Sequence, residues 1–197
     1  MAVYDARRTG ATLRRAGDSD SRKIAELFRL SAGGIADYIW QLLTPEFPGL
    51  SLLDIGERRY GREGEAFSYQ HCTIADREGE VAGMLHGYEM PAGMAPEDDP
   101  VLRPYAELEV PGSFYISGVA VYDRFQGAGI GNQLMNHARQ IALADGLSSL
   151  SLIVFAQNEG AVSLYRRLGY EVADSRAVVP HAFIPYTGDA LLLTLDV

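Results

Sequence analysis

The sequence predicts one α/β domain over residues 1–197, with a parallel pair of strands and an antiparallel hairpin in its sheet. Three observations predict this class. A strand-like stretch at 114–121 runs into a glycine-rich loop and then into a helix with one apolar face. The continuous apolar run at 150–155 is typical of a strand covered on both faces, which closes a β-α-β unit. Two stretches at 67–75 and 81–90 are joined by a short polar link and indicate a hairpin.

The segment before the hairpin is expected to be mostly helical. Its elements are a short strand at 11–16 and helices at 21–30, 33–43 and 51–66. The first helix follows the capping residues GDSD, and its apolar side is expected to comprise Ile24, Leu27, Phe28 and Leu30. The second helix ends at a turn cluster that contains Pro45 and Gly49.

The segment after the hairpin begins with an exposed loop at 91–104, because this stretch is rich in Pro, Asp and Gly and has no periodicity. The remaining elements are a strand at 114–121, a helix at 132–146, a strand at 150–155, a helix at 159–168 and strands at 170–179 and 190–197. The last helix aligns Ala161, Leu164, Tyr165 and Leu168 on one face, and Gly169 ends it.

Charge and cysteine content narrow the classes of function. The chain has 17 basic and 26 acidic side chains, a formal charge of −9 that argues against binding to nucleic acid or to a membrane surface. The lone Cys72 excludes an internal disulfide and a cysteine-built metal site, and it favours the cytoplasm as the compartment. No apolar run follows the N-terminal arginines, so neither a signal peptide nor a membrane span is expected. Cys72 lies in an alternating stretch and is interpreted as a packing residue.

The glycine-rich loop predicts an anion site. A strand that leads through glycines into a helix exposes backbone N–H groups at the helix N-terminus, where the helix dipole favours phosphate. In QGAGIGN, the residues Gly127, Gly129 and Gly131 have no Cβ to hold a diphosphate away from the backbone. The dinucleotide fingerprint does not fit, because Asn132 stands where its third glycine is required. The ATP-type loop does not fit either, because its lysine is missing.

The stretch VAVYDRFQGAGIGNQLM resembles the coenzyme A signature of the GNAT superfamily of N-acyltransferases. The core pattern of that signature, Gln/Arg-x-x-Gly-x-Gly/Ala, is matched by Gln126, Gly129 and Gly131. A single glycine motif is weak, but a second motif follows at the separation that the family has.

The second motif of the family is a strand, an asparagine, a short helix with a tyrosine and a Leu-Gly-Tyr/Phe ending. The stretch VFAQNEGAVSLYRRLGYE matches it with Asn158, Tyr165, Gly169 and Tyr170. The resemblance covers roughly residues 115–171, and the order of elements on either side is compatible with the family.

The resemblance implies a GNAT-like mixed, mostly antiparallel central sheet with a splayed parallel pair in the middle and helices on both faces. It implies an N-acetyltransferase that moves an acetyl group from acetyl-CoA to a primary amine by direct attack on the thioester, without a metal. The residues implied in cofactor binding are Val119, Ala120, Val121, Gln126, Gly127, Ala128, Gly129, Ile130, Gly131, Asn132 and Asn158. The long segment 33–65 is expected to shape the acceptor site.

The resemblance makes Tyr165 the acid that protonates the coenzyme A sulfur. The general base is less defined, because the family draws it from different positions. Glu109 is the first candidate, and Glu107 is a weaker one; strand alternation would place both on one face with Leu108 opposite. The reserve candidates for the acceptor side are His86, Glu89, Tyr115, His181 and Tyr186.

The hypotheses about function differ mainly in the acceptor that they assign. The acidic balance favours a small amine, and the alternatives are a protein amino group or a non-catalytic sensor that binds acyl-CoA without turnover. A nucleotide-binding β-α-β protein is a further reading, and a thermal shift with ATP or NAD instead of acetyl-CoA would identify it. A monomer and a homodimer both fit the sequence, because the apolar end ALLLTLDV suits either a central strand or a dimer contact.

Overall fold

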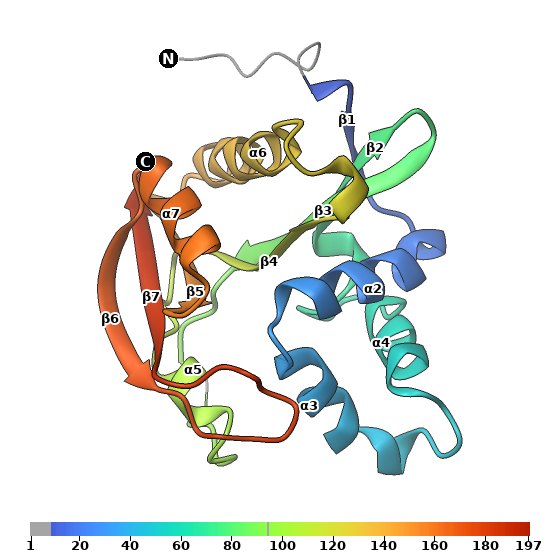
Figure 1. The fold of residues 1–197 in the computed structure, drawn as a ribbon, viewed down its shortest axis with the longest axis vertical. Helices are drawn as coiled ribbons and strands as arrows, with labels where there is room; N and C mark the ends of the chain where they lie inside the picture. The colour runs from blue at the N-terminus through green and yellow to red at the C-terminus, as the bar shows by residue number, and fades with distance from the viewer. Residues whose placement is uncertain (1–8, 94) are drawn as a thin grey trace. The chain divides into compact units, whose positions relative to one another are not determined.

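The computed structural model describes residues 9–93 and 95–197, which form two compact units. The first unit comprises the described residues up to 87 together with 118–138, and the second comprises those of 88–117 and 139–197. Strand β4 (Phe114–Val121) and helix α6 (Ile130–Ala144) each have residues in both units, and Figure 1 traces this path by colour. The expected single domain over 1–197 stays a prediction.

The strands form a seven-stranded sheet in the order β1-β2-β3-β4-β5-β7-β6. Besides β4, they are β1 (Thr12–Arg15), β2 (Cys72–Arg77), β3 (Glu80–Glu89), β5 (Ser149–Phe155), β6 (Glu171–Ala177) and β7 (Asp189–Asp196). Strands β4 and β5 run parallel, and the other registered pairs β1–β2, β2–β3, β5–β7 and β6–β7 are antiparallel. The predicted α/β class with a mixed, mostly antiparallel sheet is therefore confirmed.

The parallel pairing of β4 and β5 is short. It joins Phe114–Ile116 to Leu150–Leu152, although β4 continues to Val121 and β5 continues to Phe155. A pairing that ends while both strands continue is the pattern expected of a splayed pair.

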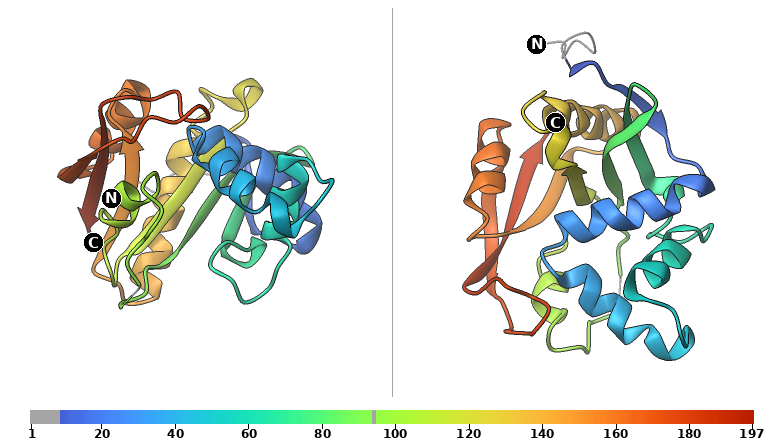
Figure 2. Two further views of the ribbon diagram at one scale, coloured as in Figure 1. Left: turned by 90° about the horizontal axis from the view of Figure 1, so that it is seen from below. Right: turned by 45° about the vertical axis from the view of Figure 1, so that its right-hand side comes forward.

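Three helices cover the early part of the first unit: α2 (Ser21–Ser31), α3 (Ile35–Leu42) and α4 (Leu52–Tyr60). They lie together in the first unit, as Figure 2 shows from two sides. Helix α2 buries Ile24, Leu27 and Phe28 as predicted, but Leu30 is 62% exposed, which corrects its assignment to the apolar side. A helix turns by about 100° per residue, so Leu30 falls off the stripe that the other three define.

The packing of α4 explains an unusual glycine in the middle of that helix. A Cβ on Gly56 would lie 2.5 Å from the Trp40 ring, so only glycine allows this close approach. Ser51 is the N-cap of α4: its hydroxyl accepts a hydrogen bond from the Asp54 N–H, and the Asp54 carboxylate accepts one from the Ser51 N–H.

In the second unit, helices α5 (Arg103–Ala106) and α7 (Glu159–Arg167) accompany strands β5, β7 and β6. Single-turn 3₁₀ helices lie at Asp18–Asp20, Thr44–Glu46, Tyr69–His71 and Asp123–Phe125. Several predictions were wrong in detail. The stretch 67–71 is a loop and a 3₁₀ turn and not the start of a strand, the helix expected at 51–66 ends at Tyr60, and α5 begins inside the loop expected at 91–104.

Candidate functional site

The glycine-rich loop of the first unit is braced at its start. At the end of β4, the Tyr122 N–H donates to the Ala82 carbonyl at 2.9 Å, and the Tyr122 hydroxyl donates to Glu26 on α2 at 2.7 Å. Arg124 then forms an ion pair with Glu80 on β3 at 2.9 Å. The loop between β4 and α6 is thereby anchored before its glycines begin.

The backbone of the loop presents donors without acceptors. In the described part of the chain, no acceptor pairs with the N–H groups of Gly127, Ala128 and Gly129. Helix α6 starts directly after them at Ile130, and the first N–H groups of any helix have no partner within the helix. Gly127 and Gly129 have φ values of 77° and 85°, in the left-handed region that favours glycine.

The space above the loop is open. Apart from the chain neighbours and the backbone of its own helix, a Cβ on Gly127 or on Gly131 would have no described atom within 4 Å. Gly131 lies in the first turn of α6 without a left-handed φ, so neither packing nor backbone conformation requires glycine there. Unpaired backbone N–H groups beside open space at a helix N-terminus are an arrangement that favours an anion.

The side chain of Gln126 folds back onto the loop. Its amide nitrogen donates to the Asp123 carboxylate at 2.9 Å and to the Val121 carbonyl at 3.3 Å. Gln126 therefore stabilises the loop's conformation as well as standing at its start.

The backbone of β4 has one edge occupied by β3. A Cβ on Gly83 would lie 2.6 Å from the Ala120 carbonyl oxygen, and the Tyr122 N–H is bonded to β3 as well. Because backbone groups alternate along a strand, the N–H and C=O groups of Val119 and Val121 face the opposite edge. These are the two residues expected to pair with an extended amide chain.

In the second unit, Asn158 is the N-cap of α7. Its side-chain oxygen accepts a hydrogen bond from the Ala161 N–H at 3.2 Å. The capping role uses the amide oxygen only, so the side-chain NH₂ group keeps its two donors.

Tyr165 lies on the inner side of α7 and is 9% exposed. Burial raises the pKa of Tyr165 to about 12. The helix ends in the left-handed residue Gly169 (φ 94°), and the N–H of Tyr170 bonds the carbonyl of Tyr165 at 3.0 Å. Together with the bond from the Gly169 N–H to the Arg166 carbonyl, this is a Schellman ending.

The Schellman ending also fixes the tyrosine ring. The rings of Tyr165 and Tyr170 lie 5.9 Å apart at 60°, which is the hydrophobic contact that accompanies this cap. The Tyr170 hydroxyl is buried without a hydrogen-bond partner in the described residues. The Leu-Gly-Tyr ending of the second motif therefore forms this helix end. Tyr170, which the sequence analysis matched without giving it a role, packs against Tyr165.

The two candidate bases have different surroundings. Glu107 is exposed and forms an ion pair with Arg176 on β6 at 2.9 Å. Glu109 is half-buried, and burial followed by repulsion from Glu97 raises its pKa. The residues follow α5 in a turn, so the strand alternation expected for this segment does not apply. The structure favours Glu109 over Glu107, because Glu107 is already engaged.

An aromatic group accompanies Glu109 in the second unit. The rings of Tyr88 and Tyr115 meet edge to face at 5.9 Å, and the pKa of Tyr115 is raised by burial and by the charges of Tyr88 and Glu109. Tyr115 is paired with Ser151 on β5, so it lies on the sheet face that also carries Phe155.

Phe155 extends this aromatic face. Tyr186 stacks on Phe155 at 4.3 Å, and Tyr105 contacts it edge to face at 6.0 Å. The Tyr105 hydroxyl is buried without a partner among the described residues, and burial raises the pKa of Tyr105 to about 12. The sequence did not predict Tyr88 and Tyr105 as site residues, because only the fold brings them to this face.

The other reserve residues have structural surroundings. His86 is fully buried in the first unit, where its ring stacks on Phe67 at 5.3 Å and its Nε2 lies 3.1 Å from the Ala66 carbonyl oxygen. Burial lowers the pKa of His86 to about 3, so it stays neutral in the core. His181 accepts a hydrogen bond from the Phe183 N–H within the loop before β7, and Glu89 is exposed. Cys72 is buried, and burial raises the pKa of its thiol.

Among the described residues, no group of three or more His, Cys, Asp or Glu side chains could hold a metal ion. In the same part of the chain, every helix falls short of the length and apolar character that crossing a bilayer requires.

Solved structures share this fold. An N-acetyltransferase from Staphylococcus aureus Mu50 is 20% identical, with a TM-score of 0.64 over 94% of this chain and 100% of that one. The ribosomal-protein-S18-alanine N-acetyltransferase from Escherichia coli is 18% identical, with a TM-score of 0.60 over 94% and 93%. A Bacillus subtilis acetyltransferase in complex with CoA is 17% identical, with a TM-score of 0.57 over 95% and 99%. At these identities the likeness is one of fold.

The sequence itself matches a family profile over most of its length. The profile of the Acetyltransferase (GNAT) family matches residues 36–170, which include the glycine-rich loop, Asn158 and Tyr165. Because this match spans more than half of the 197 residues, the chain belongs to the acetyltransferase (GNAT) family.

Proposed function

We propose that the protein is an N-acetyltransferase that transfers an acetyl group from acetyl-CoA to a primary amine by direct attack of the amine on the thioester. The observation that carries this proposal is the glycine-rich loop, where three unpaired N–H groups lead into the first turn of α6 under open space. The diphosphate of acetyl-CoA is a ligand of the size and charge for such a loop.

The glycine at position 131 supports a ligand in that open space. Glycine in a helix costs about 0.5–1 kcal/mol relative to alanine. Outside the backbone of its own helix and its chain neighbours, no described atom lies within 4 Å of a Cβ at this position, so an alanine would fit the protein alone. A ligand that lies against the backbone gives a reason for the glycine.

Tyr165 is proposed as the acid that protonates the departing thiolate. Its pKa of about 12 keeps the hydroxyl protonated at neutral pH. A free thiol has a pKa of about 8.5, so transfer to it from Tyr165 would be uphill in water. Burial raises the pKa of a thiol for the same reason that it raises that of the tyrosine, and this narrows the gap.

Glu109 is proposed as the base, directly or through a water molecule. Its raised pKa makes it a stronger base than an exposed glutamate, and the nearby Glu97 adds negative charge that attracts a cationic amine. The faces of Tyr88 and Tyr115 favour a cation as well. These features support a small cationic amine as the acceptor. The cytoplasm stays the predicted compartment.

The test of the cofactor site uses Gly131→Glu with Ala144→Glu as the matched control. Both replace a small residue of α6 with glutamate, but Gly131 lies in the first turn and Ala144 is the exposed last residue. Calorimetry with acetyl-CoA is expected to show binding to the wild type and Ala144→Glu and at least tenfold weaker binding to Gly131→Glu. Equal affinity in all three would refute the loop assignment.

The test of the reaction is thiol release from acetyl-CoA with a panel of amines, read with a colorimetric thiol reagent. Turnover with small amines supports the proposal, and turnover only with peptides that have a free amino terminus or a lysine supports a protein acceptor. Binding of acetyl-CoA with no turnover on any amine supports a sensor.

A further inference from the structure

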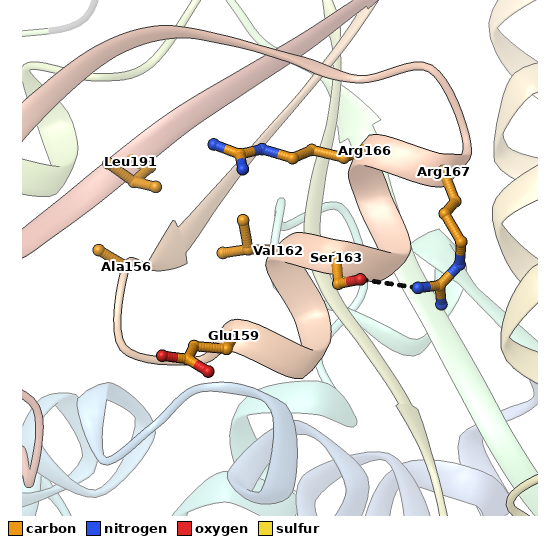
Figure 3. Close-up of a pocket in the computed structure, with 7 residues that line it drawn as sticks. All are labelled: Ala156, Glu159, Val162, Ser163, Arg166, Arg167 and Leu191. Atoms are coloured by element: carbon orange, nitrogen blue, oxygen red, sulfur yellow. Dashed lines mark hydrogen bonds between the residues drawn. The ribbon is translucent and has the colours of Figure 1, made fainter.

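A cavity that is largely open to solvent lies in the second unit, on α7 and beside strands β5 and β7. Its volume is about 570 Å³. The residues that line it are Ala156, Glu159, Val162, Ser163, Arg166, Arg167 and Leu191 (Figure 3). This volume is in the range of small-ligand sites.

The charged residues of the cavity lie on a different side of α7 from the candidate acid. Glu159, Val162, Ser163 and Arg166 are spaced three, four and seven residues apart, so they form one stripe along the helix. Tyr165 lies about 120° around the helix from Glu159 and about 100° from Arg166, but only about 60° from Val162. The two charged side chains therefore point away from the side that carries Tyr165, and Val162 lies between the two sides.

The stripe has opposite charges at its two ends. Glu159 is in the first turn of α7 and Arg166 is in the last, as the helix dipole favours. Apolar side chains of Ala156, Val162 and Leu191 lie between them, and Figure 3 shows the Arg166 guanidinium and the Glu159 carboxylate at opposite ends of the cavity.

Both terminal charges are available to a ligand. The neighbouring Arg167 is engaged, because it donates to the Ser163 hydroxyl at 2.7 Å. The side chains of Arg166 and Glu159 make no hydrogen bond or ion pair with the part of the chain that the structure describes. A guanidinium in this state presents a fork of donors that matches a carboxylate.

We propose that this cavity binds a short zwitterionic peptide, with its carboxylate at Arg166, its ammonium at Glu159 and its apolar side chains against Val162 and Leu191. The Cα atoms of Glu159 and Arg166 lie about 10 Å apart along the helix axis. Three extended peptide residues span about the same length. A tripeptide with free termini therefore spans the two backbone positions, whereas a single α-amino acid does not.

Calorimetry with trialanine, without acetyl-CoA, tests the proposal independently of acetyl transfer. The wild type is expected to bind trialanine saturably, and N-acetyl-trialanine and trialanine amide each lack one charge and should bind about tenfold more weakly or worse. Arg166→Gln is expected to weaken trialanine binding by a similar factor, as is Glu159→Gln. Arg58→Gln and Glu171→Gln, which remove exposed charges elsewhere, are expected to match the wild type.

The pattern across ligands and variants makes the test decisive. Glu159→Gln should leave the affinity for N-acetyl-trialanine unchanged, because that ligand has no ammonium for Glu159 to bind. The methyl signals of Val162 and Leu191 should shift with the same titration midpoint. The proposal is overturned if trialanine does not bind saturably, if Arg166→Gln binds like Arg58→Gln, or if those methyl signals stay fixed.

Discussion

Replacing Gly169 with alanine is expected to lower the free energy of unfolding by about 1–2 kcal/mol. Gly169 follows α7 with a φ of 94°, and this left-handed conformation brings a Cβ close to the following carbonyl oxygen. The new Cβ would lie 3.5 Å from the Leu195 Cδ1, which is an ordinary contact. The expected cost is therefore conformational and does not include a steric clash.

Gly160→Ala is the matched control, because Gly160 belongs to the same helix. It has no left-handed φ, and a Cβ there meets nothing within 4 Å. Alanine is the better helix former, so this variant is expected to gain up to about 1 kcal/mol. Urea unfolding of both variants measures the difference, and thermal unfolding should show a Tm lower by about 2–8 °C for Gly169→Ala.

The same variant tests whether the Schellman ending serves catalysis. The turn places Tyr170 against Tyr165, so Gly169→Ala is expected to lower kcat at temperatures where it is fully folded, with little change in acetyl-CoA affinity. Gly169→Ala as stable as Gly160→Ala would refute the conformational argument. A destabilised variant with normal kcat would separate the turn from the placement of Tyr165.

Three further predictions concern single side chains. Tyr165→Phe is expected to lower kcat by about 100-fold with acetyl-CoA affinity preserved in calorimetry, and unchanged turnover would remove Tyr165 from the mechanism. Glu109→Gln is expected to lower kcat/KM for the amine at least about tenfold, whereas Glu107→Gln, which loses only an exposed ion pair, should stay within about twofold; equal effects would refute the choice of Glu109. The folded-state pKa of His86 lies below its unfolded value, so the unfolded chain binds the extra proton and stability should fall as pH drops from about 6.5 toward 3, by at most about 1.4 kcal/mol per unit. Urea unfolding of His86→Gln across this range should show a smaller slope, and an unchanged slope would place the proton uptake elsewhere.

The parts of the molecule that local sequence determines were predictable. The continuous apolar run gave β5, and the glycines at 127 and 129 have the left-handed φ values that only such residues adopt easily. Gly169 ends α7 as predicted, and Asn158 caps its start. Each of these features depends on a few neighbouring residues, so periodicity and turn chemistry suffice.

The failures occurred where tertiary contacts decide. Helix α5 has only four residues, and the buried Val101 and Leu108 on either side of it anchor a segment whose composition is typical of a loop. The sequence ranks Glu109 above Glu107 but does not contain their surroundings: Arg176, which is far along the chain, forms an ion pair with Glu107, whereas Glu109 is half-buried. Local sequence patterns contain neither the packing of Val101 and Leu108 nor the ion pair between Glu107 and Arg176.

The net charge of −9 is an average over the surface, and it indicates only weakly which acceptor the enzyme uses. The fold places two particular carboxylates, those of Glu97 and Glu109, near each other. Burial raises the pKa of Glu109, and repulsion from the Glu97 carboxylate raises it further; an ammonium group bound near Glu109 would offset that repulsion. A cationic amine would therefore stabilise the charged form of the proposed base. Titration of Glu109 by NMR should show its pKa falling when a cationic acceptor binds, and an uncharged amine analogue should leave it raised.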